Sequence, residues 1–336
     1  GGGAPRAVAS RVGTMHTTVS MAFKLAVFAS LAAVPLLGES FYTELLAKTL
    51  VLAIFAMSLD LLVGSTGLVS FGHAAYFGVA AYAAALLSPE YEAANLWLVF
   101  PAAVGAAMLV AFVVGLFVLR TKGIYFIMVT LAFAQLAYFV FHDTALGGGS
   151  DGIYLNLKPS AELAGFQPFN LDNPVHLYYF ALAMLVLVYV FLARILQSPF
   201  GRVLVGIKSN EHRMQSLGYI TFRYKLAAFA LAGGLAGVAG FLYAVLFGFV
   251  TPELLSWHHS GNVLLTVILG GMGNLLGAVA GAFAFTAMQE VFGSWTKHWQ
   301  LLMGCVIVAA VLFLPGGLSA IPGRIKRTLQ GDSTHD

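Results

Sequence analysis

The sequence predicts an all-α integral membrane protein, a polytopic bundle of about ten transmembrane helices. Of 336 residues, 60% are hydrophobic and only 9% are charged, whereas soluble domains carry roughly 25% charged residues. The apolar segments reach the length of about 17–25 residues that a helix needs to cross the hydrocarbon core. A transmembrane barrel would need segments that alternate with period two, and runs such as 53–56 (Ala-Ile-Phe-Ala) do not alternate.

Hydropathy predicts ten spans along the chain. Two of them, 74–88 and 259–272, are short for a full crossing. Each could be tilted, broken or re-entrant, since membranes tolerate irregular backbone that is buried in protein or lines a cavity. The spans are 21–37, 44–63, 74–88, 96–119, 123–141, 175–196, 225–247, 259–272, 275–292 and 299–315.

Charged residues in the loops predict the orientation. With ten spans, the loops rich in Lys and Arg all fall on one side, and the acidic loops fall on the other. The positive-inside rule then places both termini in the cytoplasm. The predicted organisation is a flexible N-terminal segment or expression remnant (1–20), a transmembrane domain (21–320) with an outer loop (142–174) and a cytoplasmic loop (197–224), and a basic cytoplasmic tail (321–336).

The cytoplasmic loop is predicted to contain a short helix near 209–218. Ser209 or Asn210 can cap its start, and Gly218 stands just past its end. Met214 and Leu217, three residues apart, share one face of this helix and are its expected apolar anchors. The helix therefore suits docking onto another protein; a solvated connector helix is the alternative. The residues of this loop that we expect to act in docking are Arg202, Asn210, Glu211, Arg213, Met214, Leu217 and Gly218.

Several kinds of chemistry are missing from the sequence. No Lys follows a Gly, so the phosphate-binding pattern G-x-x-x-x-G-K-[ST] does not occur. H-E-x-x-H and C-x-x-C do not occur either, and Cys305 is the single cysteine. We expect no catalytic residues, no metal and no cofactor, which disfavours a membrane-embedded enzyme.

Polar residues within the predicted spans are candidates for a substrate pathway or for a packing network. Asp60 is an acid near the middle of an apolar span, and the sequence leaves open whether it serves a pathway or a structural hydrogen bond. Glycine pairs four residues apart, 233/237 and 277/281, predict close helix packing. The pathway or packing candidates are Asp60, Ser70, Gly72, His73, Gln135, Gly271 and Asn274.

The sequence also contains a weak internal echo. Residues 72–78 (GHAAYFG) and 271–277 (GMGNLLG) each precede an Ala-rich run. Both are predicted to lie at a cytoplasmic turn before an ascending span, as in a possible weak internal repeat of short Gly-interrupted spans. We expect both segments to lie in or beside the central packing region, because glycine permits close approach of the backbone.

Three blocks of the sequence resemble the branched-chain amino-acid permease family of ATP-binding-cassette importers. Residues 61–78 (LLVGSTGLVSFGHAAYFG) are similar to the family motif N-L-L-x-G-x-x-G-x-x-S-x-G-H-A-A-F-F-G, and 198–229 are similar to its cytoplasmic loop. The block 268–277 (ILGGMGNLLG) resembles its L-G-G-x-G-x-x-x-G turn, and 148–152 (GGSDG) is typical of the LivM-like subunit. Asp60 stands where the family more often has Asn.

The resemblance implies a multi-pass subunit of a bacterial inner-membrane importer that moves branched-chain amino acids. The implied partners are a LivH-like second permease subunit, two ATPase subunits, a periplasmic substrate-binding protein and the surrounding membrane lipid; no nucleic acid is expected. The helix near 209–218 would transmit ATPase motion, and the binding protein would dock near 142–174. The alternatives are a stand-alone secondary transporter or channel for a small solute, or an importer of urea, short amides or aromatic acids.

Overall fold

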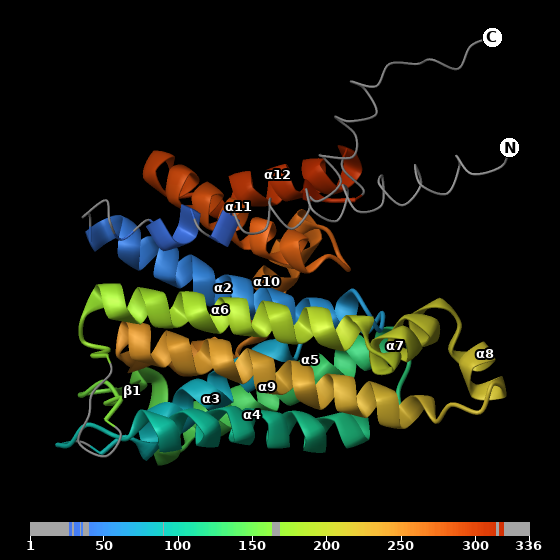
Figure 1. Cartoon of the computed structure of the whole chain (residues 1–336), viewed down its shortest axis with the longest axis horizontal. Coiled ribbons are helices and arrows are strands. Elements are labelled where there is room, and N and C mark those ends of the chain that lie inside the picture. Colours follow the sequence, from blue (N-terminus) through green and yellow to red (C-terminus); the bar gives the residue numbers. More distant parts are fainter. Residues whose placement is uncertain are drawn as a thin grey trace, which may run out of the picture.

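In the computed structural model, long helices lie side by side in an elongated bundle (Figure 1). The structure describes residues 27–28, 30–33, 35, 40–89, 91–162, 169–313 and 316–318. The N-terminal segment 1–20, the tail 321–336 and most of the first predicted span lie outside the described residues.

Six helices of the described chain are long and apolar enough to cross a membrane. They are α2 (Ser40–Val63), α4 (Leu96–Val118), α5 (Ile124–Asp143), α6 (Pro174–Gln197), α9 (Thr221–Phe247) and α11 (Leu275–Trp295). Three further helices, α3 (His73–Leu87), α10 (Trp257–Gly270) and α12 (Trp299–Phe313), are shorter. The prediction of an all-α membrane protein is confirmed, while a count of about ten crossings goes beyond these six.

Small residues set the distance between the central helices. Ala103, Ala107 and Ala111 form a buried stripe on α4, and the stripe faces Gly233 and Gly237 of α9. A Cβ added to Gly233 would collide with the Ala111 Cβ, and one added to Gly237 would lie 2.7 Å from the Ala107 Cβ. The predicted close packing at this glycine pair is therefore confirmed.

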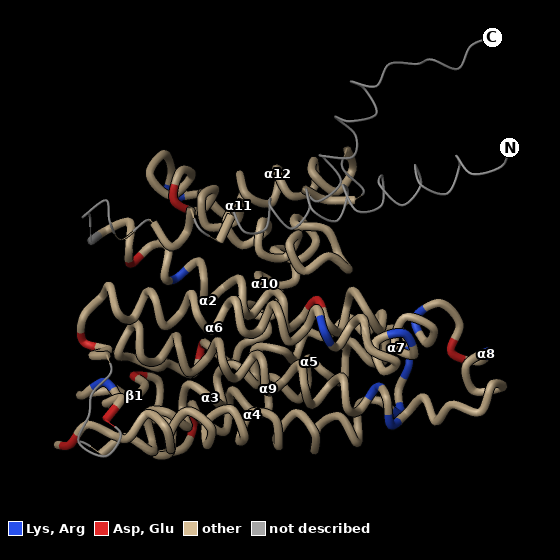
Figure 2. Tube along the Cα trace, viewed as in Figure 1, with Lys and Arg blue, Asp and Glu red and all other residues tan. Residues whose placement is uncertain are grey.

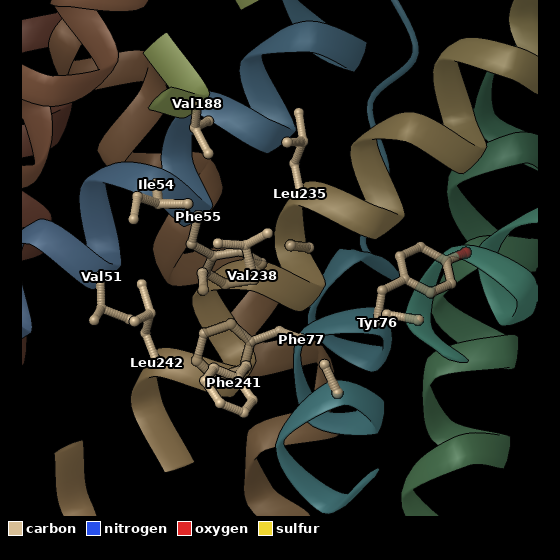
Figure 3. Close-up of a cluster of buried hydrophobic side chains, with 14 of the residues drawn as sticks. Val51, Ile54, Phe55, Tyr76, Phe77, Val188, Leu235, Val238, Phe241 and Leu242 are labelled. Carbon is tan, nitrogen blue, oxygen red and sulfur yellow. The ribbon is translucent and has the colours of Figure 1, made fainter. Parts of the chain in front are cut away.

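A cluster of apolar side chains fills the space where α2, α3 and α9 meet. Figure 3 shows Val51 and Phe55 of α2 beside Phe77 of α3 and Leu242 of α9. The rings of Phe55 and Phe77 lie 4.7 Å apart between centroids, which is within the range of favourable aromatic pairs. This cluster fixes α3 against the two most buried long helices.

The two ends of the bundle differ in structure and in charge. At one end η2 (Ala145–Gly147) and η3 (Gly149–Asp151) precede β1 (Ile153–Tyr154), which pairs antiparallel with β2 (Phe249–Val250). From β2 the chain continues through η4 (Pro252–Leu255) into α10. At the other end lie α7 (Pro199–Ser209) and α8 (Glu211–Ser216). Figure 2 shows Lys and Arg gathered mainly at the α7–α8 end and Asp and Glu mainly towards the β1 end.

Candidate functional site

The amino end of α3 begins inside the bundle, where hydroxyl groups of other helices hold it. The Ala74 N–H donates to the Ser260 Oγ of α10 at 2.8 Å, and the Phe71 N–H donates to the Thr130 Oγ1 of α5 at 3.2 Å. The first N–H groups of a helix have no partner within the helix, and an unpaired N–H is costly away from water. These hydroxyls make a helix start at this depth possible, as the short span at 74–88 suggested.

His73 is fully buried at this helix start. Its Nε2 lies 2.8 Å from the Ser58 Oγ of α2, and the Ser58 hydroxyl donates to the Phe55 carbonyl at 2.7 Å. With the hydroxyl proton used in that way, the His73 Nε2–H is the donor in the His73–Ser58 bond. The His73 ring also stacks on Phe55, with centroids 5.5 Å apart. Among the described residues the buried Nδ1 has no hydrogen-bond partner.

Ser70 and Gly72 form the approach to this helix start. The Gly72 N–H donates to the Ser70 Oγ at 3.2 Å, and a Cβ on Gly72 would lie 2.6 Å from the Thr130 carbonyl oxygen. Gly72 and Gly78 are both buried, so the expected central position of this segment is confirmed. Only the start of this block belongs to the predicted turn: Gly72 ends the connection from α2, and 73–78 are already the first turns of α3.

The expectation that Asp60 sits near the middle of its span is wrong, because α2 ends only three residues later at Val63. The side chain is 2% exposed, and its Oδ1 accepts the Gly273 N–H at 2.7 Å. Gly64 lies against this bond, since a Cβ there would approach the Gly273 nitrogen to 2.6 Å. Asp60 therefore ties the end of α2 to the turn between α10 and α11.

The α10–α11 turn depends on glycine and on Asn274. Gly271 and Gly273 have φ of 106° and 85°, in a region that L side chains rarely adopt. The Asn274 Oδ1 caps α11 by accepting the Leu276 N–H at 3.1 Å. Gly277 packs closely against Gly270, since a Cβ added to Gly277 would lie 2.7 Å from the Gly270 carbonyl oxygen. This second glycine segment is a turn, as predicted, and its helical ends are buried.

Lys208 and Glu211 connect α7 and α8 to the long helices. The Lys208 Nζ donates to the Gly64 carbonyl at 2.7 Å, just past the end of α2. The Glu211 Oε1 lies 2.6 Å from the Nζ of Lys225, in the second turn of α9, and accepts the Thr221 hydroxyl at 3.0 Å. Burial alone would raise the pKa of Glu211, but the hydrogen bond and charge of Lys225, together with Thr221, lower it below its ordinary value.

The short helix predicted in the cytoplasmic loop is present as α8, and the Asn210 Oδ1 caps it by accepting the Arg213 N–H at 2.9 Å. Of its two expected apolar anchors, only Leu217 is free, with 65% of its surface exposed. Met214 is not free: a Cβ on Gly206 of α7 would lie 2.7 Å from its Sδ. Arg202, Arg213 and Gly218 are exposed.

A half-open cavity of about 390 Å³ lies between α2, α10 and α11. Its walls include Phe55 and Phe77 of the apolar cluster, and its polar lining comes mostly from α2, η4, α10 and α11. That polar lining consists of Lys48, Tyr243, Thr251, Glu253, Ser256, His258, His259, Asn262, Thr286 and Gln289.

None of the seven pathway candidates lines this cavity. Six of them cluster at the α3 start or at the α2–Gly273 tie, and Gln135 is half-buried on α5. Sequence reasoning missed the cavity because its polar residues are scattered along the chain from Lys48 to Gln289. The adjacent pair His258–His259 was the one local signal. Within the described residues, no group of three His, Cys, Asp or Glu side chains could hold a metal ion.

Comparison with known proteins identifies relatives of the whole bundle. A family model described as "Branched-chain amino acid transport system / permease component" matches residues 41–311. The high-affinity branched-chain amino acid transport system permease protein LivM of Escherichia coli (strain K12) is 29% identical over 315 residues, which cover 88% of this chain and 74% of that protein. LivM of Salmonella typhimurium matches to the same extent. The autoinducer 2 import system permease protein LsrC of Klebsiella pneumoniae is 30% identical over 141 residues, 40% of this chain and 41% of that protein. No solved structure matches.

Proposed function

Because this chain belongs to the family of permease components of branched-chain amino acid transport systems, we propose that it is a membrane-spanning subunit of an ATP-driven importer for branched-chain amino acids. The observation that carries the proposal is the match over residues 41–311, which spans every long helix of the bundle. The chain has no P-loop of its own, so the energy would come from separate ATPase subunits. A second permease subunit and a substrate-binding protein would complete the complex.

The proposal includes about ten crossings of a bacterial inner membrane, with both termini in the cytoplasm. The gathering of Lys and Arg at the α7–α8 end supports this orientation (Figure 2). The β1 end, with the loop 142–174, would then face the binding protein. The short helices α3 and α10 would contribute partial crossings within the bundle.

The α7–α8 pair is proposed to receive the motion of the ATPases. Leu217, Tyr219 and Ile220 are exposed apolar side chains at this end, and exposed apolar clusters commonly mark protein contacts. Lys208 would carry the motion to the end of α2, and Glu211 would carry it to α9 through Lys225.

The test is uptake of radiolabelled L-leucine into proteoliposomes that contain the assembled complex with its binding protein. We expect uptake that requires ATP inside the vesicle. Uptake driven by an ion gradient without ATPase subunits would instead establish the secondary transporter. Urea, acetamide and phenylalanine serve as competing solutes, and preferential uptake of any of them would replace the branched-chain assignment.

Docking has its own test. Leu217→Ala should reduce recovery of ATPase subunits with the affinity-purified chain at least several-fold, because truncation of buried apolar anchors at an interface costs more than about 1 kcal/mol. Leu146→Ala is the matched control, since Leu146 is 61% exposed in η2 at the opposite end. Equal recovery from both variants would argue against docking at α8.

A further inference from the structure

We propose that the cavity between α2, α10 and α11 is a binding site for a free amino acid with an apolar side chain, formed within this single subunit. The inference rests on the proposed function and assigns the solute to particular residues. None of the pathway candidates predicted from the sequence lines this cavity, so the site consists of other residues.

The apolar wall suits a hydrocarbon side chain. Val51, Phe55, Phe77 and Leu254 line one part of the cavity, and Figure 3 shows the first three gathered in the cluster between α2 and α3. The volume of about 390 Å³ falls within the roughly 300–1,000 Å³ of small-molecule pockets. A branched aliphatic group placed here would leave water for an apolar surface.

The two charges that line the cavity match the two charges of a zwitterion. Lys48 on α2 is a cation for the carboxylate, and Glu253 on η4 is an anion for the ammonium group. Within the described part of the chain, neither is in an ion pair or a side-chain hydrogen bond. Two unpaired opposite charges beside one apolar wall are complementary to an amphipathic amino acid, whereas a hydrocarbon or a simple ion would leave one of these features unused.

His259 adds an independent observation. Its ring lines the cavity between Phe55 and Phe77, with centroid distances of 5.4 and 5.1 Å. Its Nε2 is buried without a hydrogen-bond partner among the described residues. Buried polar atoms are normally hydrogen-bonded, so this wall of the cavity carries a polar atom whose hydrogen-bonding capacity the described chain leaves unused.

Protection from thiol labelling tests occupancy in the assembled complex. In a Cys305→Ser background, Asn262→Cys places a thiol on the cavity lining, and Met272→Cys places one on the exposed α10–α11 turn as the control. We expect L-leucine to slow maleimide labelling at position 262 and not at 272. Equal rates with and without L-leucine would overturn the site. So would a position 262 that labels in the isolated chain but is blocked in the complex, because the partner permease would then cover the cavity.

Charge variants test how the zwitterion is held. Lys48→Gln should raise the concentration of L-leucine needed for protection roughly tenfold and leave that of leucinol, which lacks the carboxylate, unchanged. Glu253→Gln should weaken protection by L-leucine by a similar factor. It should leave protection by 4-methylpentanoate, which lacks the ammonium group, unchanged. Equal weakening of all three probes would indicate a disturbed structure and overturn the assignment. Protection by L-leucine without ATP-driven uptake would refute the proposed function but support the binding site. ATP-driven uptake without protection would support the proposed function but refute the binding site.

Discussion

The ion pair between Glu211 and Lys225 should contribute measurably to the stability of the α7–α8 end. The two side chains are 25% and 7% exposed, and their charged atoms lie 2.6 Å apart. Removal of the carboxylate leaves the Lys225 ammonium group shielded from water without its partner. Glu211→Gln and Lys225→Met remove one charge each while keeping most of the side-chain volume.

The expected magnitude follows from the partial burial. Exposed pairs contribute about 0.2–1 kcal/mol, and loss of one partner of a buried pair costs about 3–5 kcal/mol. With one member a quarter exposed, we expect each single variant to lose about 1–2 kcal/mol in the free energy of unfolding. The double variant should lose less than the sum of the two, with a coupling energy of about 1 kcal/mol. Unfolding of the detergent-solubilised protein, followed by tryptophan fluorescence, measures all four corners of the cycle.

The same pair predicts a pH dependence. The pKa of Glu211 is lowered in the folded protein by Lys225 and Thr221 against the opposing effect of burial. The pair therefore stabilises the fold fully above the pKa of the unfolded chain, about 4.3, and this contribution is lost as the pH falls through the lower folded value. The stability difference between the wild-type protein and Glu211→Gln should shrink as the pH is lowered from 6 to 3.5.

A coupling energy within about 0.3 kcal/mol of zero, or a wild-type advantage that does not shrink between pH 6 and 3.5, would refute this reasoning. The outcome also decides how docking is tested. Sequence reasoning gave Glu211 a contact with a partner, but its carboxylate is already occupied within the chain. Uncoupling by Glu211→Ala would therefore mix loss of structure with loss of docking, whereas Leu217→Ala does not.

Three further outcomes are expected. Asp60→Ala should lower the free energy of unfolding by about 1.5–3 kcal/mol and Asp60→Asn by clearly less, because the amide oxygen can still accept the Gly273 N–H; equal losses would refute that hydrogen bond. Gly240→Ala should destabilise by more than about 2 kcal/mol, because the new Cβ would collide with the Phe77 carbonyl, whereas Gly105→Ala, with nothing within 4 Å, should be neutral or stabilising; thermal unfolding in detergent compares the two. The purified chain alone should not bind ATP, and micromolar binding in equilibrium dialysis would contradict the reading of the absent P-loop.

The helices were predictable because each requires only a local pattern. Nine of the ten predicted spans coincide within a few residues with helices between α2 and α12, since a long apolar run in a membrane has almost no other stable backbone structure. The glycine pairs 233/237 and 277/281 were predictable for a similar reason. Their spacing places both glycines on one helix face, and the structure packs α4 and α10 against them.

The polar partners were not predictable, because each bond joins residues that are far apart in sequence. Asp60 meets the backbone of Gly273, 213 positions away, and Lys208 meets the carbonyl of Gly64, 144 positions away. Because these partners are backbone N–H and C=O groups, which nearly all residue types carry, the amino-acid sequence does not indicate them. Met214 is likewise covered by α7, and α7 was not predicted because the sequence 199–209 is only moderately apolar.

The ties at the α7–α8 end reach helices that also line the cavity. Lys208 holds the end of α2, which supplies Val51 and Phe55, and Glu211 holds α9, which supplies Tyr243. Asp60 extends the first tie to the turn before α11, which supplies part of the polar lining. Coupling between distant sites requires an element whose position both sites can bias. On the proposed function α2 and α9 would be such elements, because each is a single continuous helix that is tied to α7–α8 near one end and contributes residues to the cavity lining farther along, Val51 and Phe55 from α2 and Tyr243 from α9.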